Sequence, residues 1–141
     1  PDALKGIASP SILIVDDEAH ILQVLSLKLR HCGYHITTAV DGEDALHQVK
    51  EDVPDLVITD VQMPFVNGLE LAHSLHNDKN TTHIPVVVLT ARGHTLATSD
   101  TDIPNVKKVI SKPFSPRGIV ELVEDLLKNT PITTSKTSEA A

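Results

Sequence analysis

Three aspartates, one threonine and one lysine stand out in this 141-residue chain because their side chains suit the chemistry of phosphate and metal ions. They are Asp16, Asp17, Asp60, Thr90 and Lys112. Carboxylates that crowd together repel one another and favour protonation unless a cation lies between them. Mg²⁺ is the cation we expect, because it prefers oxygen ligands and usually keeps several waters beside one or two carboxylates. The charges of the three carboxylates, one such ion and the lysine cancel.

A carboxylate held against that ion is a candidate phosphoryl acceptor. Phosphoryl transfer depends on positioning and charge neutralisation more than on covalent help from the protein. The oxygens of the transferred group would face the metal ion, the Lys112 ammonium group and the Thr90 hydroxyl group. Taken singly, each residue is more often a helix cap, a strand residue or a surface lysine. The hypothesis therefore depends on a fold that brings all of them to one place.

The elements that would position these residues can be predicted from the hydrophobic pattern. Five short apolar segments rich in β-branched residues alternate with segments of helical periodicity. We expect strands over residues 12–15, 35–39, 56–60, 86–89 and 106–110. We expect helices over about 21–32, 42–53, 68–75 and 116–127, with a weak and short candidate at 94–104. This alternation predicts an α/β fold with a parallel sheet covered on both faces.

In sheets of this kind, ligands bind beyond the carboxyl ends of the strands. The first predicted strand ends in Asp16, Asp17 and Glu18, and the third ends in Asp60. The fourth strand ends in Thr90 and Ala91, and the fifth runs into residues 111–114. The carboxylates, the hydroxyl group and the ammonium group are therefore predicted to meet at one edge of one sheet.

Charge and composition exclude several classes of function. Nineteen acidic and 12 basic residues give a net charge of −7, which argues against the phosphate neutralisation that non-specific nucleic-acid binding requires. No apolar run approaches the ~20 residues that cross a bilayer. A single cysteine, Cys32, fits a reducing compartment, and we expect it to be a small buried hydrophobic residue. We expect a soluble, cytoplasmic domain without direct contact to nucleic acid or membrane.

One domain is expected over residues 11–129, between a flexible N-terminal segment at 1–10 and a flexible tail or truncated linker at 130–141. The tail is rich in Thr, Ser, Lys and Ala and has no periodicity. Because the chain begins with Pro rather than Met, we expect it to be cut from a longer protein. A stand-alone regulator, a relay domain and a fragment of a hybrid sensor kinase all remain open.

The motifs resemble those of the receiver domain of bacterial response regulators, including the chemotaxis regulators. The segments that carry the resemblance are ILIVDDE at 12–18, VITDVQMP at 57–64, Gly68, VLTA at 88–91 and KPF at 112–114. Together they extend the resemblance over about residues 11–129. The resemblance implies a flavodoxin-like, doubly wound (βα)5 fold with a five-stranded parallel sheet in the order 2-1-3-4-5. It also implies a two-component or phosphorelay function.

The same resemblance implies a role for each acidic position. Asp60 would be the phosphorylation site. Mg²⁺, or Mn²⁺ in its place, would be bound by Asp17, by Asp60 and by the backbone carbonyl of Gln62, while Asp16 would hold a metal-bound water. Gln62 and Arg92 would lie beside the phosphoryl group and tune its hydrolysis.

The remaining implied roles concern binding of the phosphoryl group and the switch in conformation that follows. Lys112, the Thr90 hydroxyl group and the Ala91 backbone amide would contact the phosphoryl oxygens. The peptide bond between Lys112 and Pro113 is a cis candidate, since proline makes that isomer accessible. The phosphoryl donor would be a histidine kinase or a histidine phosphotransfer protein. The domain would be a signalling switch that assists its own phosphorylation and dephosphorylation, and not an enzyme.

Two departures from the family pattern concern the output of the switch. Relatives usually carry Tyr or Phe three residues before the lysine, where this chain has Val109. They also usually carry a Gly-Ala segment just before that aromatic residue, where this chain has residues 103–106. Phosphoryl acceptance uses neither position, so we expect it to be retained. The hypothesis that follows is a non-standard output surface.

Three other functions fit the residues less well than this interpretation. An aspartate-based phosphatase usually has a second Asp two residues after the nucleophile, where this chain has Gln62. A degenerate receiver that only binds proteins would normally have lost part of its acidic set, which is complete here. A flavin- or nucleotide-binding domain would need a phosphate-cradling glycine loop after the first strand, and none is present.

Overall fold

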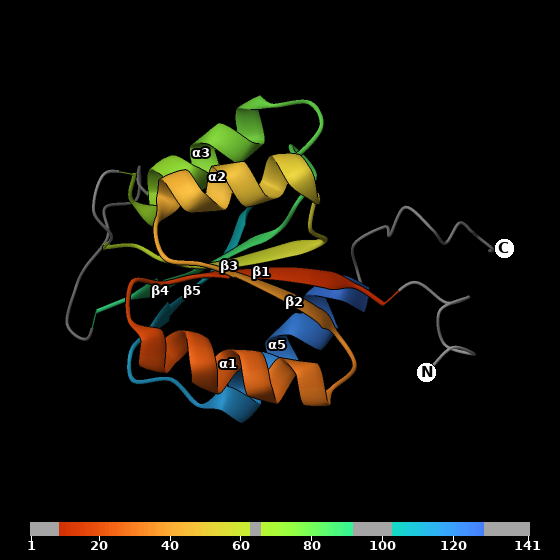
Figure 1. The fold of residues 1–141 in the computed structure, drawn as a ribbon, viewed down its shortest axis with the longest axis vertical. Helices are drawn as coiled ribbons and strands as arrows, with labels where there is room; N and C mark the ends of the chain where they lie inside the picture. The colour runs from red at the N-terminus through yellow and green to blue at the C-terminus, as the bar shows by residue number, and fades with distance from the viewer. Residues whose placement is uncertain (1–8, 63–65, 92–102, 129–141) are drawn as a thin grey trace, which may run out of the picture.

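Alternating strands and helices form a three-layered α/β structure in the computed structural model, which describes residues 9–62, 66–91 and 103–128. Five parallel strands make one sheet in the order β2-β1-β3-β4-β5, as expected. The elements of the described ranges are β1 Ser11–Val15, α1 Ala19–His31, β2 His35–Ala39, α2 Gly42–Glu51, β3 Leu56–Asp60, α3 Gly68–Asn77, β4 Val86–Thr90, β5 Val106–Ser111 and α5 Pro116–Lys128. Figure 1 shows α2 and α3 on one face of the sheet and α1 and α5 on the other.

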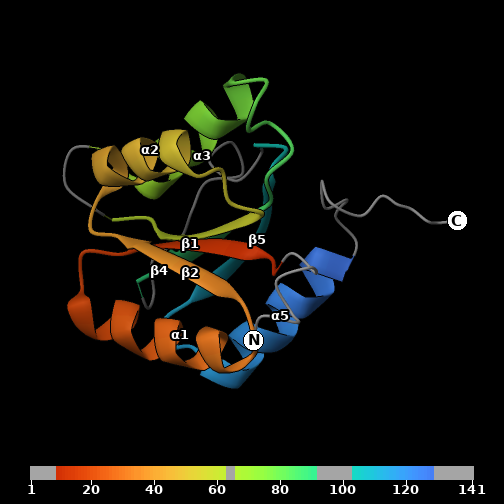
Figure 2. The same ribbon diagram turned by 45° about the vertical axis from the view of Figure 1, so that its right-hand side comes forward.

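Successive strand residues pack on opposite faces of the sheet, which gives the domain two cores. Leu13 and Val57 pack with helix residues such as Leu71 in the core under α2 and α3. Ile14 and its neighbours pack in the core under α1 and α5, which lie side by side in Figure 2. Every residue of β3 and β4 is buried, because both strands are covered on both faces. That burial explains their continuous apolar sequence.

The outer strand β2 and the end of α1 show where the chain meets solvent. Only Ile36 and Ala39 of β2 are buried, as suits a strand at the sheet edge, where the expected strand order places it. Helix α1 stops at its C-cap residue Cys32, and Gly33 turns the chain with a φ of 97° that suits glycine. The expectation of a buried Cys32 is wrong: the side chain is exposed, because the helix ends before this residue can extend the buried stripe of Leu25 and Leu29.

Side-chain caps fix the start of three helices near the functional edge of the sheet. The Asp41 side chain accepts a hydrogen bond from Asp44 N at 2.8 Å at the start of α2. Asn67 and Glu70 form a reciprocal capping box at the start of α3. Ser115 Oγ accepts a hydrogen bond from Gly118 N at 3.1 Å at the start of α5.

Some expectations concern residues outside the described ranges. These are residues 1–8 of the expected flexible N-terminal segment, the expected tail at 130–141, most of the weak helix candidate at 94–104, and the position of Arg92. In the ranges that are described, no helix is both long enough and apolar enough to cross a membrane.

Gly68 stands where the start of α3 passes against the end of β3. A Cβ atom at this position would lie 2.2 Å from the carbonyl oxygen of Asp60 and 2.9 Å from its carbonyl carbon. Both atoms belong to buried backbone, which has little freedom to move. Glycine at this position therefore holds the first turn of α3 directly against the residue expected to accept the phosphoryl group.

We expect Gly68→Ala to destabilise the domain by about 2–4 kcal/mol, because the new methyl group would overlap the Asp60 carbonyl group. The free energy of unfolding in urea measures this effect. Gly118→Ala in helix α5 is the matched control, since the atom nearest to its new Cβ, the Cβ of Ser115, would be 3.5 Å away. That variant should gain up to about 1 kcal/mol. Equal unfolding free energies for Gly68→Ala and the wild type would contradict the close approach.

Candidate functional site

The carboxyl ends of β1 and β3 bring three aspartates together. Asp16 and Asp17 follow β1, and Asp60 is the last residue of β3. Each offers a carboxylate oxygen, and these oxygens all lie within 4.8 Å of one another. Asp16 is fully buried, Asp60 is 5% exposed and Asp17 is exposed, so the cluster opens to solvent on one side. The structure thus brings together the three carboxylates expected from the sequence.

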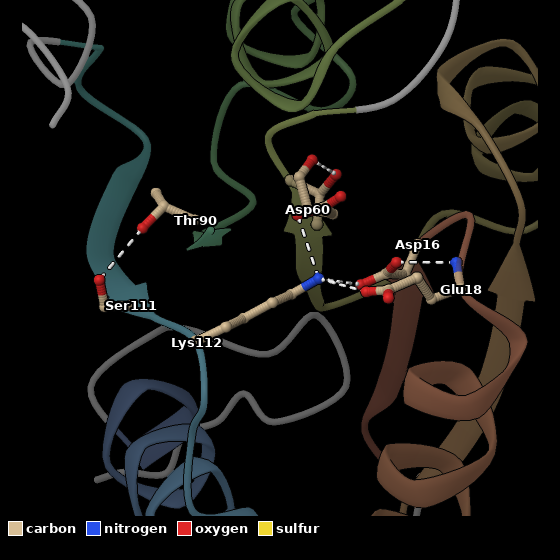
Figure 3. A network of polar contacts seen from close by, with 7 residues as sticks. Asp16, Glu18, Asp60, Thr90, Ser111 and Lys112 are labelled. Atoms are coloured by element: carbon tan, nitrogen blue, oxygen red, sulfur yellow. Dashed lines mark hydrogen bonds and ion pairs between the residues drawn. The ribbon is translucent and has the colours of Figure 1, made fainter. Parts of the chain in front are cut away.

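Lys112 reaches across from the end of β5 to the carboxylates (Figure 3). Its Nζ atom lies 3.2 Å from Asp16 Oδ2, 2.9 Å from Glu18 Oε1 and 3.4 Å from Asp60 Oδ1. Glu18 was not among the residues predicted for the site, although it makes the shortest of these contacts. The signal in the sequence was the third acidic residue at the end of β1.

Backbone contacts hold the acceptor and the lysine in place. The Thr59 hydroxyl group donates to the Asp60 carbonyl oxygen at 3.0 Å, and Val61 N donates to Leu89 O at 2.9 Å. Lys112 N donates to the carbonyl oxygen of Thr90 at 2.8 Å, which ties the lysine to the neighbouring strand. The peptide bond between Lys112 and Pro113 is cis, as predicted.

The pairing of β4 with β5 is interrupted once, before the site. Val86 pairs with Val106, but Val87 pairs with Lys108, so one residue of β5 is skipped. From there the pairing runs regularly to Thr90 and Ser111. Because of this one-residue shift, Ser111 pairs with Thr90, and Lys112 comes next, at the functional site.

The Thr90 side chain points away from the carboxylates in this structure (Figure 3). Its Oγ1 atom lies 3.5 Å from Ser111 Oγ, and the residue is 2% exposed. Ala91 follows at the end of β4 and is half-buried, and Gln62 is exposed beside Asp60 in the chain. Val109, at the position where relatives usually carry an aromatic residue, is half-buried against the core under α2 and α3.

Burial and like charges make the two inner carboxylates hard to ionise. Burial, reinforced by the charge of Asp16, raises the pKa of Asp60 to about 6 although Lys112 opposes the shift. Burial also raises the pKa of Asp16, against the hydrogen bond that its carboxylate accepts from Glu18 N at 2.9 Å and against Lys112. For Lys112, burial alone would lower the pKa, but contacts with Glu18, Asp16 and Asp60 outweigh it and raise the pKa. Burial is thus the larger cause of both raised aspartate pKa values, and the charges of neighbouring carboxylates add to it.

This donor set fits a hard divalent cation. Three carboxylate oxygens lie close enough to share one ion, and no nitrogen or sulfur ligand is part of the cluster. A cation among the carboxylates would stabilise their charged forms, which burial and the neighbouring carboxylates now disfavour by raising the pKa values of Asp16 and Asp60. The chemistry that such an arrangement supports is the binding and transfer of phosphoryl groups.

Comparison with known proteins identifies relatives over almost the whole described chain. A family model described as the response regulator receiver domain matches residues 12–124. The phosphate regulon transcriptional regulatory protein PhoB of Pseudomonas aeruginosa is 36% identical over 124 residues, which are 85% of this chain and 52% of that protein. The chain spans about half the length of the curated relatives it matches.

Solved structures show the same similarity in three dimensions. The crystal structure of a putative response regulator from Chloroflexus aurantiacus has a TM-score of 0.79 at 32% identity, covering 86% of this chain and 99% of that one. The chemotaxis protein CheY4 of Vibrio cholerae has a TM-score of 0.77 at 26% identity, covering 84% of this chain and 98% of that one.

The raised pKa of Asp60 predicts a pH-dependent gain in stability for Asp60→Asn. A carboxyl group with a pKa of about 6 in the folded state, against 3.8 ordinarily, stabilises the fold fully below about pH 4. That contribution is lost as the pH rises through about 6. Without divalent cations, Asp60→Asn should therefore exceed the wild type in unfolding free energy by on the order of 2 kcal/mol at about pH 8, and by little at about pH 4.

Urea unfolding at the two pH values, with a chelator present, measures this difference. Asp52→Asn, which changes an exposed aspartate, is the control and should show no comparable gain. Added Mg²⁺ should stabilise the wild type and not Asp60→Asn, since the ion needs the charged carboxylate. A difference between Asp60→Asn and the wild type that is the same at both pH values would contradict the prediction.

Proposed function

The chain belongs to the response regulator receiver domain family, and from this premise we propose that Asp60 accepts a phosphoryl group from a phosphohistidine donor. Family membership gives the chain the function of a two-component phosphoacceptor domain. The observation that carries the assignment to Asp60 is its carboxylate at the end of β3, 3.4 Å from Lys112 Nζ and beside Asp16 and Asp17. In the described ranges Asp16 shares the burial, the lysine contact and the two neighbouring carboxylates, but its side chain is fully buried and accepts a hydrogen bond from Glu18 N, so Asp60 is the acceptor that a donor can reach.

Mg²⁺, or Mn²⁺ in its place, is the proposed cofactor. Asp17 and Asp60 would bind the ion directly together with the backbone carbonyl of Gln62, and Asp16 would hold one of its waters. The bound ion supplies positive charge that offsets the charge of the transferred group. The exposure of Asp17 supports this assignment, because a partly hydrated ion needs a side open to water.

The reaction needs little from the protein beyond positioning and charge. A carboxylate oxygen of Asp60 attacks phosphorus and forms the new P–O bond while the P–N bond to the donor imidazole breaks. The departing imidazole keeps the bonding electrons and takes a proton from solvent. The Lys112 ammonium group then binds the phosphoryl oxygens, as do the Thr90 hydroxyl group and the Ala91 amide. Arg92 and Gln62 are the proposed residues that tune the later hydrolysis.

The proposed switch is a rotation of Thr90 from Ser111 toward the new phosphoryl group. We treat the domain as an equilibrium between an inactive and an active arrangement. A phosphoryl group can shift that equilibrium only if it interacts differently with the two arrangements. The present contact of the Thr90 hydroxyl group with Ser111 supplies such a difference. Because the domain changes its own state and turns over no separate substrate, we class it as a switch and not an enzyme.

The partners follow from the same proposal. A histidine kinase or a histidine phosphotransfer protein would supply the phosphoryl group. Curated relatives such as PhoB of Pseudomonas aeruginosa and PhoP of Bacillus subtilis are named as transcriptional regulatory proteins. Since the chain corresponds to about half of these proteins, control of transcription through a further domain is the proposed output.

Asp60→Asn should abolish phosphorylation by acetyl phosphate in the presence of Mg²⁺, because the amide cannot act as the nucleophile. Intact-mass spectrometry of the wild type and the variant measures the phosphorylated fraction. Asp52→Asn, at an exposed aspartate, should be phosphorylated like the wild type. Removal of divalent cations with a chelator should lower the phosphorylated fraction of the wild type at least about tenfold. A phosphoprotein signal of equal size in Asp60→Asn would refute the assignment.

A further inference from the structure

The Lys112 ammonium group has three N–H donors, and three carboxylates surround it in the described part of the chain. Asp16, Glu18 and Asp60 lie 3.2 Å, 2.9 Å and 3.4 Å from its Nζ atom. The donors of the lysine are therefore fully used before a phosphoryl group arrives. Contact with phosphoryl oxygens requires that one of these carboxylates give up its place.

The three carboxylates differ in how easily they can leave. The Asp16 side chain is fully buried and also accepts a hydrogen bond from Glu18 N. Water therefore cannot replace Lys112 as its partner. Phosphorylation turns the Asp60 carboxylate into the ester that carries the phosphoryl group, so a phosphoryl oxygen can take over its contact with Lys112, and contact with a second phosphoryl oxygen needs another donor. The Glu18 side chain is 60% exposed, so water can replace the lysine at little cost.

The surroundings of Glu18 also leave room for its departure. Its side chain lines a groove of about 450 Å³ together with Lys112, His20 and Phe114. Charge favours the departure as well. With Glu18 included, the site holds four carboxylates, and a doubly negative phosphoryl group added beside Glu18 would be repelled by it.

We propose that Glu18 is a positioning residue that occupies Lys112 in the resting domain and opposes its contact with the phosphoryl group. Glu18 must release the ammonium group before Lys112 can bind the phosphoryl oxygens. The strength of the Glu18–Lys112 ion pair therefore sets how readily the domain enters its phosphorylated arrangement. This inference rests on the proposed acceptance of a phosphoryl group at Asp60.

The test compares Glu18→Gln with the wild type at saturating Mg²⁺. The probe is beryllofluoride, a phosphoryl analogue, followed by the amide NMR signals of Thr90 and Ala91, since the chain has no tryptophan to report binding. Glu18→Gln should bind beryllofluoride about three- to fivefold more tightly, because the competing ion pair is gone. The acetyl phosphate concentration that gives half-maximal phosphorylation should fall by a similar factor.

Two further variants separate the ion pair from the general effect of charge. Glu43→Gln removes an equal charge from an exposed position on α2, whose first turn lies at the same edge of the sheet. It should bind beryllofluoride like the wild type. Glu18→Asp keeps the charge but is one methylene group too short to hold Lys112 at its present distance, so it should resemble Glu18→Gln. Wild-type affinity in Glu18→Asp would overturn the pairing and leave only charge as the cause.

The resting state offers a readout that does not depend on phosphorylation. In ¹⁵N-lysine-labelled protein, the Nζ signal of Lys112 should shift in Glu18→Gln and stay unchanged in Glu43→Gln. Equal beryllofluoride affinities for Glu18→Gln and the wild type would overturn this inference alone, provided that both take up a phosphoryl group. If neither takes up a phosphoryl group, the proposed function itself fails and the inference fails with it.

Discussion

Mutual repulsion of carboxylates at the carboxyl edge of the sheet is the constraint on which the rest of this structure depends. Asp16 and Asp60 are nearly inaccessible to water, and in the described residues Lys112 is the one cation that contacts both. Burial first, and the neighbouring carboxylates second, raise the pKa values of both aspartates, and a single ammonium group does not offset these effects. The site is therefore built to attract a cation, and a cation in turn attracts phosphate. The unfavourable energy of the carboxylate cluster without a cation is therefore part of its function.

The fold supplies what such a cluster requires, which is rigid support from buried backbone. β3 and β4 are covered on both faces, so the acceptor and the threonine stand on strands with little freedom to move. Gly68 lets the start of α3 close against the acceptor. Groups that have more freedom lie around this frame: Glu18 is exposed, and Lys112 enters from β5 at the sheet edge. Fixed and adjustable parts of the site thus come from different elements.

The strands and the place of the site could be predicted from the sequence, because both follow from patterns among residues that are close together in the chain. β-branched runs identified the strands, and the rule that parallel strands end at one edge brought Asp16, Asp60 and Lys112 together. The exposure of Cys32 was missed because helical periodicity does not report where a helix stops. The role of Glu18 was missed because its contact with Lys112 joins residues 94 apart in sequence, and an acidic residue at a strand end is usually solvated. Side-chain partners of that kind become visible only in three dimensions.

The skipped residue in the pairing of β4 with β5 has a consequence for how such a chain tolerates insertions and deletions. Side chains alternate between the two faces of a strand, so the phase of β5 from Lys108 onward decides whether Lys112 or its neighbour faces the acidic cluster. Loss of one residue between Lys108 and Ser111 would shift that phase and put Pro113 at the place from which Lys112 now reaches the carboxylates. The length of this strand is thus a chemical parameter of the site, as much as the identity of any residue in it.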